Sequence, residues 1–155
     1  MSKPLKDGYF ETKLVWHTDK VGAFKWTVGS TYAFLVDFIQ EDTLRVYIQT
    51  SASNYPNGLP PKTELDRKQV DLAIMCYASA LNVDDYPNKW IEWMQPKKLV
   101  LVHWEDFFRE SRIDDDQKLV RGTKPSKVRK RIDALGKKRD YFVMPRPGTR
   151  MEVTY

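Results

Sequence analysis

The most constraining feature of this chain is the segment Leu99–Arg109, LVLVHWEDFFR. Four aliphatic residues lead directly into His103, and acidic and aromatic residues follow. A continuous apolar run of this kind is typical of a strand buried on both faces, as in the sheets of α/β proteins. The segment therefore predicts a central strand that ends at His103. In open α/β sheets, the carboxyl end of such a strand is where ligands bind.

Hydrophobic patterns predict further elements along the chain. We expect a helix over Asp84–Gln95 that packs on the sheet through Trp90, Ile91 and Met94, and a second helix over Ser126–Lys138. Strands are expected at Tyr9–His17, Thr31–Phe38, Leu44–Gln49, Val70–Tyr77, Leu99–Val102, Tyr141–Met144 and Met151–Thr154. Because strands and helices alternate after a strand-rich start, the pattern favours one layered α/β domain over residues 1–155.

Composition excludes several classes of protein. With 41% hydrophobic residues in 155, the chain can bury a core and is not expected to be disordered. Cys76 is the one cysteine, so no internal disulfide can form, which fits a reducing compartment or a buried thiol. No apolar run is long enough for a membrane span, and the first residues lack a signal core. These features together predict a cytoplasmic location and no membrane partner.

His103 is the first candidate for site chemistry. An imidazole at the end of a central strand, with Glu105 and Asp106 close by in sequence, has the composition of a metal site. The two carboxylates would act as second-shell acceptors that orient the imidazole. The alternative is a histidine satisfied by ordinary hydrogen bonds, and the residues alone leave both interpretations open.

Several segments together resemble one family. YPNKWIEWMQPKKLVLVHWEDFFR is similar to the late part of metallo-β-lactamase-fold hydrolases, where a buried strand ends in a metal-binding histidine followed by W-[ED]-D-F-F. Weaker similarities are found in VDLAIMCYASA, LRVYIQTSAS and MPRPGTRMEV. The resemblance runs from about Val15 to the C-terminus. It implies the second half of a metallo-β-lactamase-like sandwich, a mixed sheet with helices packed on it.

The resemblance also implies which metal ligands are kept. His103 matches the last histidine ligand, and His17, in LVWHTDK, matches the middle one. The bridging aspartate would fall at Thr50 or Ser51, where neither residue is a carboxylate. The family's H-x-H-x-D-H motif is absent, since the chain has two histidines.

These losses predict a protein related to metal-dependent hydrolases but inactive alone. Catalytic zinc needs about three protein ligands, so two imidazoles would hold zinc weakly or not at all. The chain is then a fragment, one half of a split protein, or a degenerate relative that serves as a scaffold. Half a sandwich leaves an apolar face open, so we expect a homo-oligomer or a complementary chain.

A basic segment supports a different class of function. Lys and Arg are concentrated between Lys118 and Arg139, where Asp133 is the one acid, and the rest of the chain is mildly acidic. Such a segment is typical of a noncatalytic module that contacts nucleic acid or a protein partner. The alternative is a solvated helix face, which is the more common origin of such runs.

Overall fold

The computed structural model describes residues 31–39, 41–78, 80–106, 109, 119–135, 140–143, 150 and 152. By its internal contacts the chain divides into two compact units, Met1–Thr31 and Tyr32–Tyr155. The helices and strands described below lie in the second unit. The strands predicted at Tyr9–His17 and Met151–Thr154 are outside the described residues, apart from Glu152.

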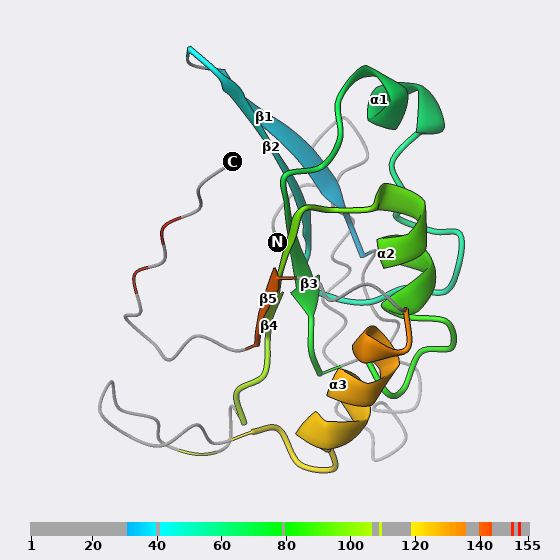
Figure 1. The fold of residues 1–155 in the computed structure, drawn as a ribbon. Coiled ribbons are helices and arrows are strands. Elements are labelled where there is room, and N and C mark those ends of the chain that lie inside the picture. Colours follow the sequence, from blue (N-terminus) through cyan, green and yellow to red (C-terminus); the bar gives the residue numbers. More distant parts are fainter. Residues whose placement is uncertain are drawn as a thin grey trace, which may run out of the picture. The chain divides into compact units, whose positions relative to one another are not determined.

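A five-stranded sheet forms the centre of the second unit (Figure 1). The strands are neighbours in sequence order: β1 (Phe34–Ile39), β2 (Thr43–Gln49), β3 (Leu72–Cys76), β4 (Lys98–Val102) and β5 (Asp140–Val143). β1 and β2 form an antiparallel hairpin, and the pairs β2–β3, β3–β4 and β4–β5 are parallel. The predicted mixed sheet is therefore confirmed.

Three helices connect the parallel strands and lie on the same face of the sheet in Figure 1. They are α1 (Lys62–Arg67), α2 (Asn88–Met94) and α3 (Pro125–Asp133). Parallel neighbours need such crossover connections, because a tight turn cannot return the chain to the same end of the sheet. Within the described part of the chain, no helix is long and apolar enough to cross a membrane.

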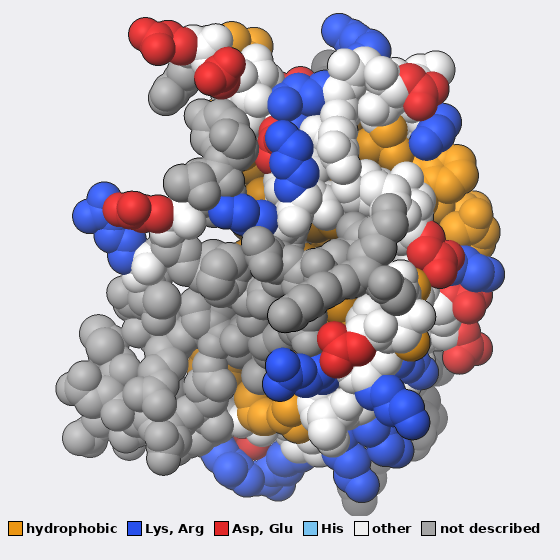
Figure 2. All heavy atoms as spheres, viewed as in Figure 1, with side chains coloured by type: hydrophobic (Ala, Val, Ile, Leu, Met, Phe, Trp, Pro, Cys, Tyr) orange, Lys and Arg blue, Asp and Glu red, His pale blue; other side chains and the backbone are white. Residues whose placement is uncertain are grey.

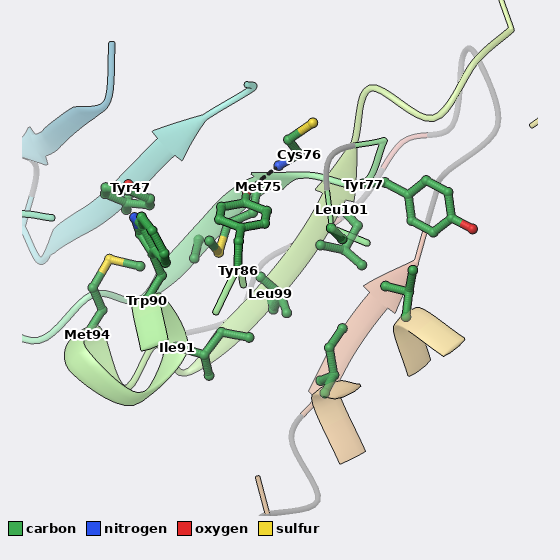
Figure 3. Close-up of a cluster of buried hydrophobic side chains, with 14 of the residues drawn as sticks. Tyr47, Met75, Cys76, Tyr77, Tyr86, Trp90, Ile91, Met94, Leu99 and Leu101 are labelled. Carbon is green, nitrogen blue, oxygen red and sulfur yellow. Dashed lines mark hydrogen bonds between the residues drawn. The ribbon is translucent and has the colours of Figure 1, made fainter. Parts of the chain in front are cut away.

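The main core lies between the sheet and α2 (Figure 3). Trp90, Ile91 and Met94 are all buried, as their helical spacing predicted. Trp90 meets the ring of Tyr86 edge-on, with ring centroids 5.1 Å apart. Burial of the large Trp90 side chain in the core removes much apolar area from water and so stabilises the packing of α2 on the sheet.

The opposite face of the sheet is also apolar. Val46, Leu72 and Val100 are buried there, and partly buried aliphatic neighbours surround them. A strand covered on both sides has no polar face, which explains why β3 and β4 read as continuous apolar runs. The expectation that Leu99–Val102 forms a doubly buried central strand is thus confirmed.

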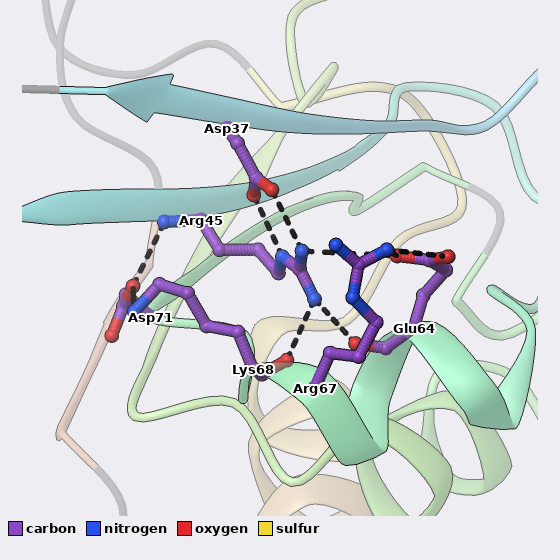
Figure 4. Close-up of polar contacts among 6 residues, drawn as sticks. All are labelled: Asp37, Arg45, Glu64, Arg67, Lys68 and Asp71. Carbon is purple, nitrogen blue, oxygen red and sulfur yellow. Dashed lines mark hydrogen bonds and ion pairs between the residues drawn. The ribbon is translucent and has the colours of Figure 1, made fainter.

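A network of charged groups lies at one edge of the sheet, here meaning the side on which the parallel strands begin (Figure 4). The Arg45 guanidinium forms two bonds of 2.7 Å to the Asp37 carboxylate and also donates to the carbonyls of Glu64 and Lys68. These last two contacts fasten the end of α1 to β2. Arg45 is 4% exposed, so its charge is taken out of water and satisfied by this network.

Asp71, which directly precedes β3, extends the same network. Its Oδ2 accepts from the backbone N–H of Arg45 at 2.8 Å, and the ammonium groups of Lys68 and Lys97 lie at 3.0 and 2.7 Å from its oxygens. Asp71 is 1% exposed. Burial alone raises the pKa of Asp71, but the Arg45 N–H and the two lysines outweigh burial and hold that pKa below its ordinary value.

Candidate functional site

The candidate site lies at the opposite edge, where β2, β3 and β4 end. Their last residues are Gln49, Cys76 and Val102, and Thr50 and His103 follow β2 and β4. Backbone bonds extend the ladder past the strand ends, since Tyr77 N–H donates to Val102 O at 2.7 Å. The edge is therefore continuous, and the residues just beyond it are held in register.

His103 leaves β4 in a left-handed backbone conformation, with φ of 59°. Its amide carbonyl still accepts from Ala78 N–H at 3.2 Å, so the β3–β4 ladder includes it. Few residues other than glycine adopt positive φ, and such positions cluster at functional sites. Here the left-handed residue ends the strand and turns the chain, with the imidazole, at this edge.

The imidazole is tied to the neighbouring strand end. His103 Nδ1 lies 2.8 Å from the carbonyl oxygen of Thr50. A carbonyl oxygen only accepts, so Nδ1 carries the proton and donates it. In a neutral imidazole the lone pair is then on Nε2. A backbone carbonyl that fixes one ring nitrogen in this way is a common partner of metal-ligating histidines.

Cys76 is the neighbour of His103 that sequence reasoning missed. Its Sγ lies 3.6 Å from His103 Nδ1, and its side chain is buried. The available signal was the strand register: Cys76 ends β3 opposite Val102, one residue before His103. The Cys76 N–H donates to Tyr86 OH at 2.8 Å, which joins this strand end to the core around α2.

The predicted replacement positions, Thr50 and Ser51, are close to His103 through the Thr50 carbonyl. Thr50 and Ser51 begin a loop that Gln49 and Ser53 stabilise. Gln49 Nε2 donates to Ser53 Oγ at 3.1 Å, and Ser53 Oγ donates to Asn57 O at 2.8 Å. A carboxylate introduced at Thr50 or Ser51 would therefore belong to a loop that these bonds hold in place, next to the residue that contacts the imidazole.

The two carboxylates predicted to orient the His103 imidazole, those of Glu105 and Asp106, have other partners among the described residues. Glu105 Oε2 accepts from Trp104 N–H at 3.2 Å, and the Glu105 backbone forms an isolated antiparallel bridge with Leu119. Asp106 is buried, with Arg109 Nε at 3.1 Å and Arg121 Nε at 3.4 Å from its Oδ2. These contacts give both carboxylates a structural role, and an orienting role toward His103 remains a prediction.

His17, the other predicted ligand, lies outside the described residues. Among the residues that are described, no group of three or more His, Cys, Asp or Glu side chains is placed to hold a metal ion. Zinc sites that activate water use about three protein ligands. The described ligand set therefore does not fit a hydrolytic zinc centre, and no hydrolytic step follows from it.

Comparison of the chain with protein-family models, curated proteins and solved structures gave no match.

Proposed function

We propose that this chain is a metallo-β-lactamase-like half-domain that retains the frame of a metal site but does not hydrolyse substrates by itself. The observation that carries the proposal is the bond from His103 Nδ1 to the Thr50 carbonyl. This bond joins His103, which matches the family's last histidine ligand, to Thr50, one of the two positions where the resemblance places the lost bridging aspartate. Zinc would bind weakly at this strand end, and the missing ligands would come from a complementary chain.

Titration calorimetry with zinc on the full chain tests this proposal. We expect weak binding by the wild type and its loss in His103→Ala. Thr50→Asp or Ser51→Asp should tighten binding by at least about tenfold, the scale on which even outer-shell groups change metal affinity. Asn57→Asp is the matched control, because it adds the same charge to the exposed part of the same loop.

Two results would contradict the proposal. The first is zinc affinity that is equal in the wild type, His103→Ala and both aspartate variants, which would place any site elsewhere. The second is zinc-dependent cleavage of a chromogenic lactam or phosphodiester by the purified wild type, with loss of that cleavage in His103→Ala. Such cleavage would mean that the chain carries a complete catalytic site.

A further inference from the structure

Helix α3 is held firmly against the rest of the unit. Val128 and Ile132 are each 1% exposed and pack into the main core. Arg131 Nη1 donates to Ala80 O at 2.6 Å, and Asn88 Nδ2 donates to Arg131 O at 3.0 Å. The outer side of α3 is therefore a fixed surface, with a position set by the core.

The structure divides the basic residues of this region into two groups. The described arginines, Arg121, Arg129 and Arg131, all have partners. Arg131 binds backbone carbonyls, while the Nε atoms of Arg121 and Arg129 lie 3.4 and 3.9 Å from the carboxylates of Asp106 and Asp133. Arg131 thus serves the fold. The exposed lysines form the second group.

Lys124, Lys127 and Lys130 form what we call the lysine stripe. All three are exposed, and within the described residues none of them forms an ion pair. Lys127 and Lys130 are neighbours on the surface of α3, and Lys124 is the extended residue that directly precedes the helix. No acid lies in the first turn of α3, so no carboxylate of that turn offsets their charge. Figure 2 shows Lys and Arg side chains gathered where Figure 1 places α3.

We infer that the lysine stripe binds the phosphate backbone of nucleic acid without reading its sequence. Three neighbouring exposed ammonium groups, none of them ion-paired among the described residues, match a polyanion with regularly spaced phosphates. Lysine acts on phosphate as a point charge, which positions a duplex but does not specify bases. An anionic membrane fits less well, because a helix at a bilayer surface inserts its apolar face, and that face of α3 is buried in the core. The inference does not depend on metal at His103.

Fluorescence anisotropy with a labelled mixed-sequence DNA duplex tests the inference on the full chain. Three phosphate contacts predict that affinity falls about 40-fold between 50 and 200 mM salt. In the triple variant Lys124→Gln/Lys127→Gln/Lys130→Gln, affinity at low salt should fall by at least about tenfold, and the slope of log affinity against log salt should become shallower by about 2.7. Glutamine keeps helix propensity, so circular dichroism should be unchanged.

The matched control is Lys62→Gln/Arg67→Gln/Lys89→Gln, which removes the same charge from the exposed Lys62 and Arg67 on α1 and the half-exposed Lys89 on α2. It should keep most of the affinity and the wild-type salt slope. The inference is overturned if the two triple variants lose affinity equally, or if the wild type does not bind the duplex at about 100 μM protein, the weak end of non-specific binding. Binding to phosphatidylserine vesicles without binding to the duplex would also overturn it, in favour of a membrane partner.

Discussion

The two edges of the parallel strands satisfy their polar groups in different ways. At the edge where the strands begin, Asp71 and Arg45 are buried and paired with opposite charges and backbone groups. At the edge where the strands end, His103 adopts a left-handed conformation, and its ring donates to the Thr50 carbonyl. The first arrangement stabilises the fold, whereas the second holds an imidazole at some local cost. Stability and function are thus expected to separate between the two edges.

The largest effect is expected from Asp71→Ala at the first edge. The substitution leaves the Arg45 N–H and two lysines without their shared carboxylate. Breaking a buried charge network of this kind costs about 3 kcal/mol, and here the lysines can partly recover by turning to water. Urea unfolding would measure the loss. A free energy of unfolding within about 1 kcal/mol of the wild type would show that this network contributes little.

Acid should weaken the same edge. The hydrogen bond from the Arg45 side chain lowers the pKa of Asp37. Burial raises the pKa of Asp71, but the Arg45 backbone N–H and the two lysines lower it further than burial raises it. A carboxyl with a lower pKa in the folded state binds protons more weakly there than in the unfolded chain. Stability is therefore complete above about pH 5 and falls as the pH drops below about 4 and through the native pKa values.

The pH dependence can be assigned by substitution. In Asp71→Asn the loss of unfolding free energy between about pH 5 and pH 3 should be smaller than in the wild type, since one titrating group is gone. Urea unfolding at several pH values measures both curves. Parallel curves would mean that other carboxyl groups cause the acid sensitivity.

Gly58→Ala probes the loop that supports the second edge. Gly58 has φ of +83°, and an added Cβ would lie 2.6 Å from Gln49 Nε2, a buried amide that helps to anchor the loop. We expect a loss of about 2 kcal/mol, from left-handed strain and from displacement of Gln49. Gly122→Ala is the control, because Gly122 has the same φ with nothing within 4 Å. Equal losses in thermal unfolding would mean that Gln49 moves aside freely.

Apolar patterns in the sequence predicted most of the sheet and the buried face of α2. Strand positions and the buried face of α2 followed from runs of apolar residues, and Trp90, Ile91 and Met94 confirm the helical spacing. The predicted helix begins four residues too early, since α2 starts at Asn88 and Asp85 adopts φ of 64° in the preceding turn. α1 has no buried residue, so no hydrophobic periodicity indicates it.

The polar contacts were harder to predict for a common reason. Arg45 looks like a solvent-facing residue in an alternating strand, and its burial depends on Asp37 from β1 and on carbonyls at the end of α1. At the other edge, the strand end at His103 was predicted, and the resemblance indicated Thr50 or Ser51 beside it. The contact with Cys76 required the register of β3 against β4. Contacts between segments distant in sequence have no local pattern.

The smallest effect we expect is also the most specific to the second edge. At most positions glycine is less stable than alanine, but an L residue with φ of 59° carries a strain that glycine does not. The free energy of unfolding of His103→Gly should therefore be about 1 kcal/mol higher than that of His103→Ala, although both variants lose the bond to Thr50. Inside α3, by contrast, the exposed Arg129→Gly should be less stable than Arg129→Ala by a similar amount. If alanine is the more stable residue at both positions, the left-handed strain at His103 is absent in solution. This edge would then hold the imidazole at no cost to the fold.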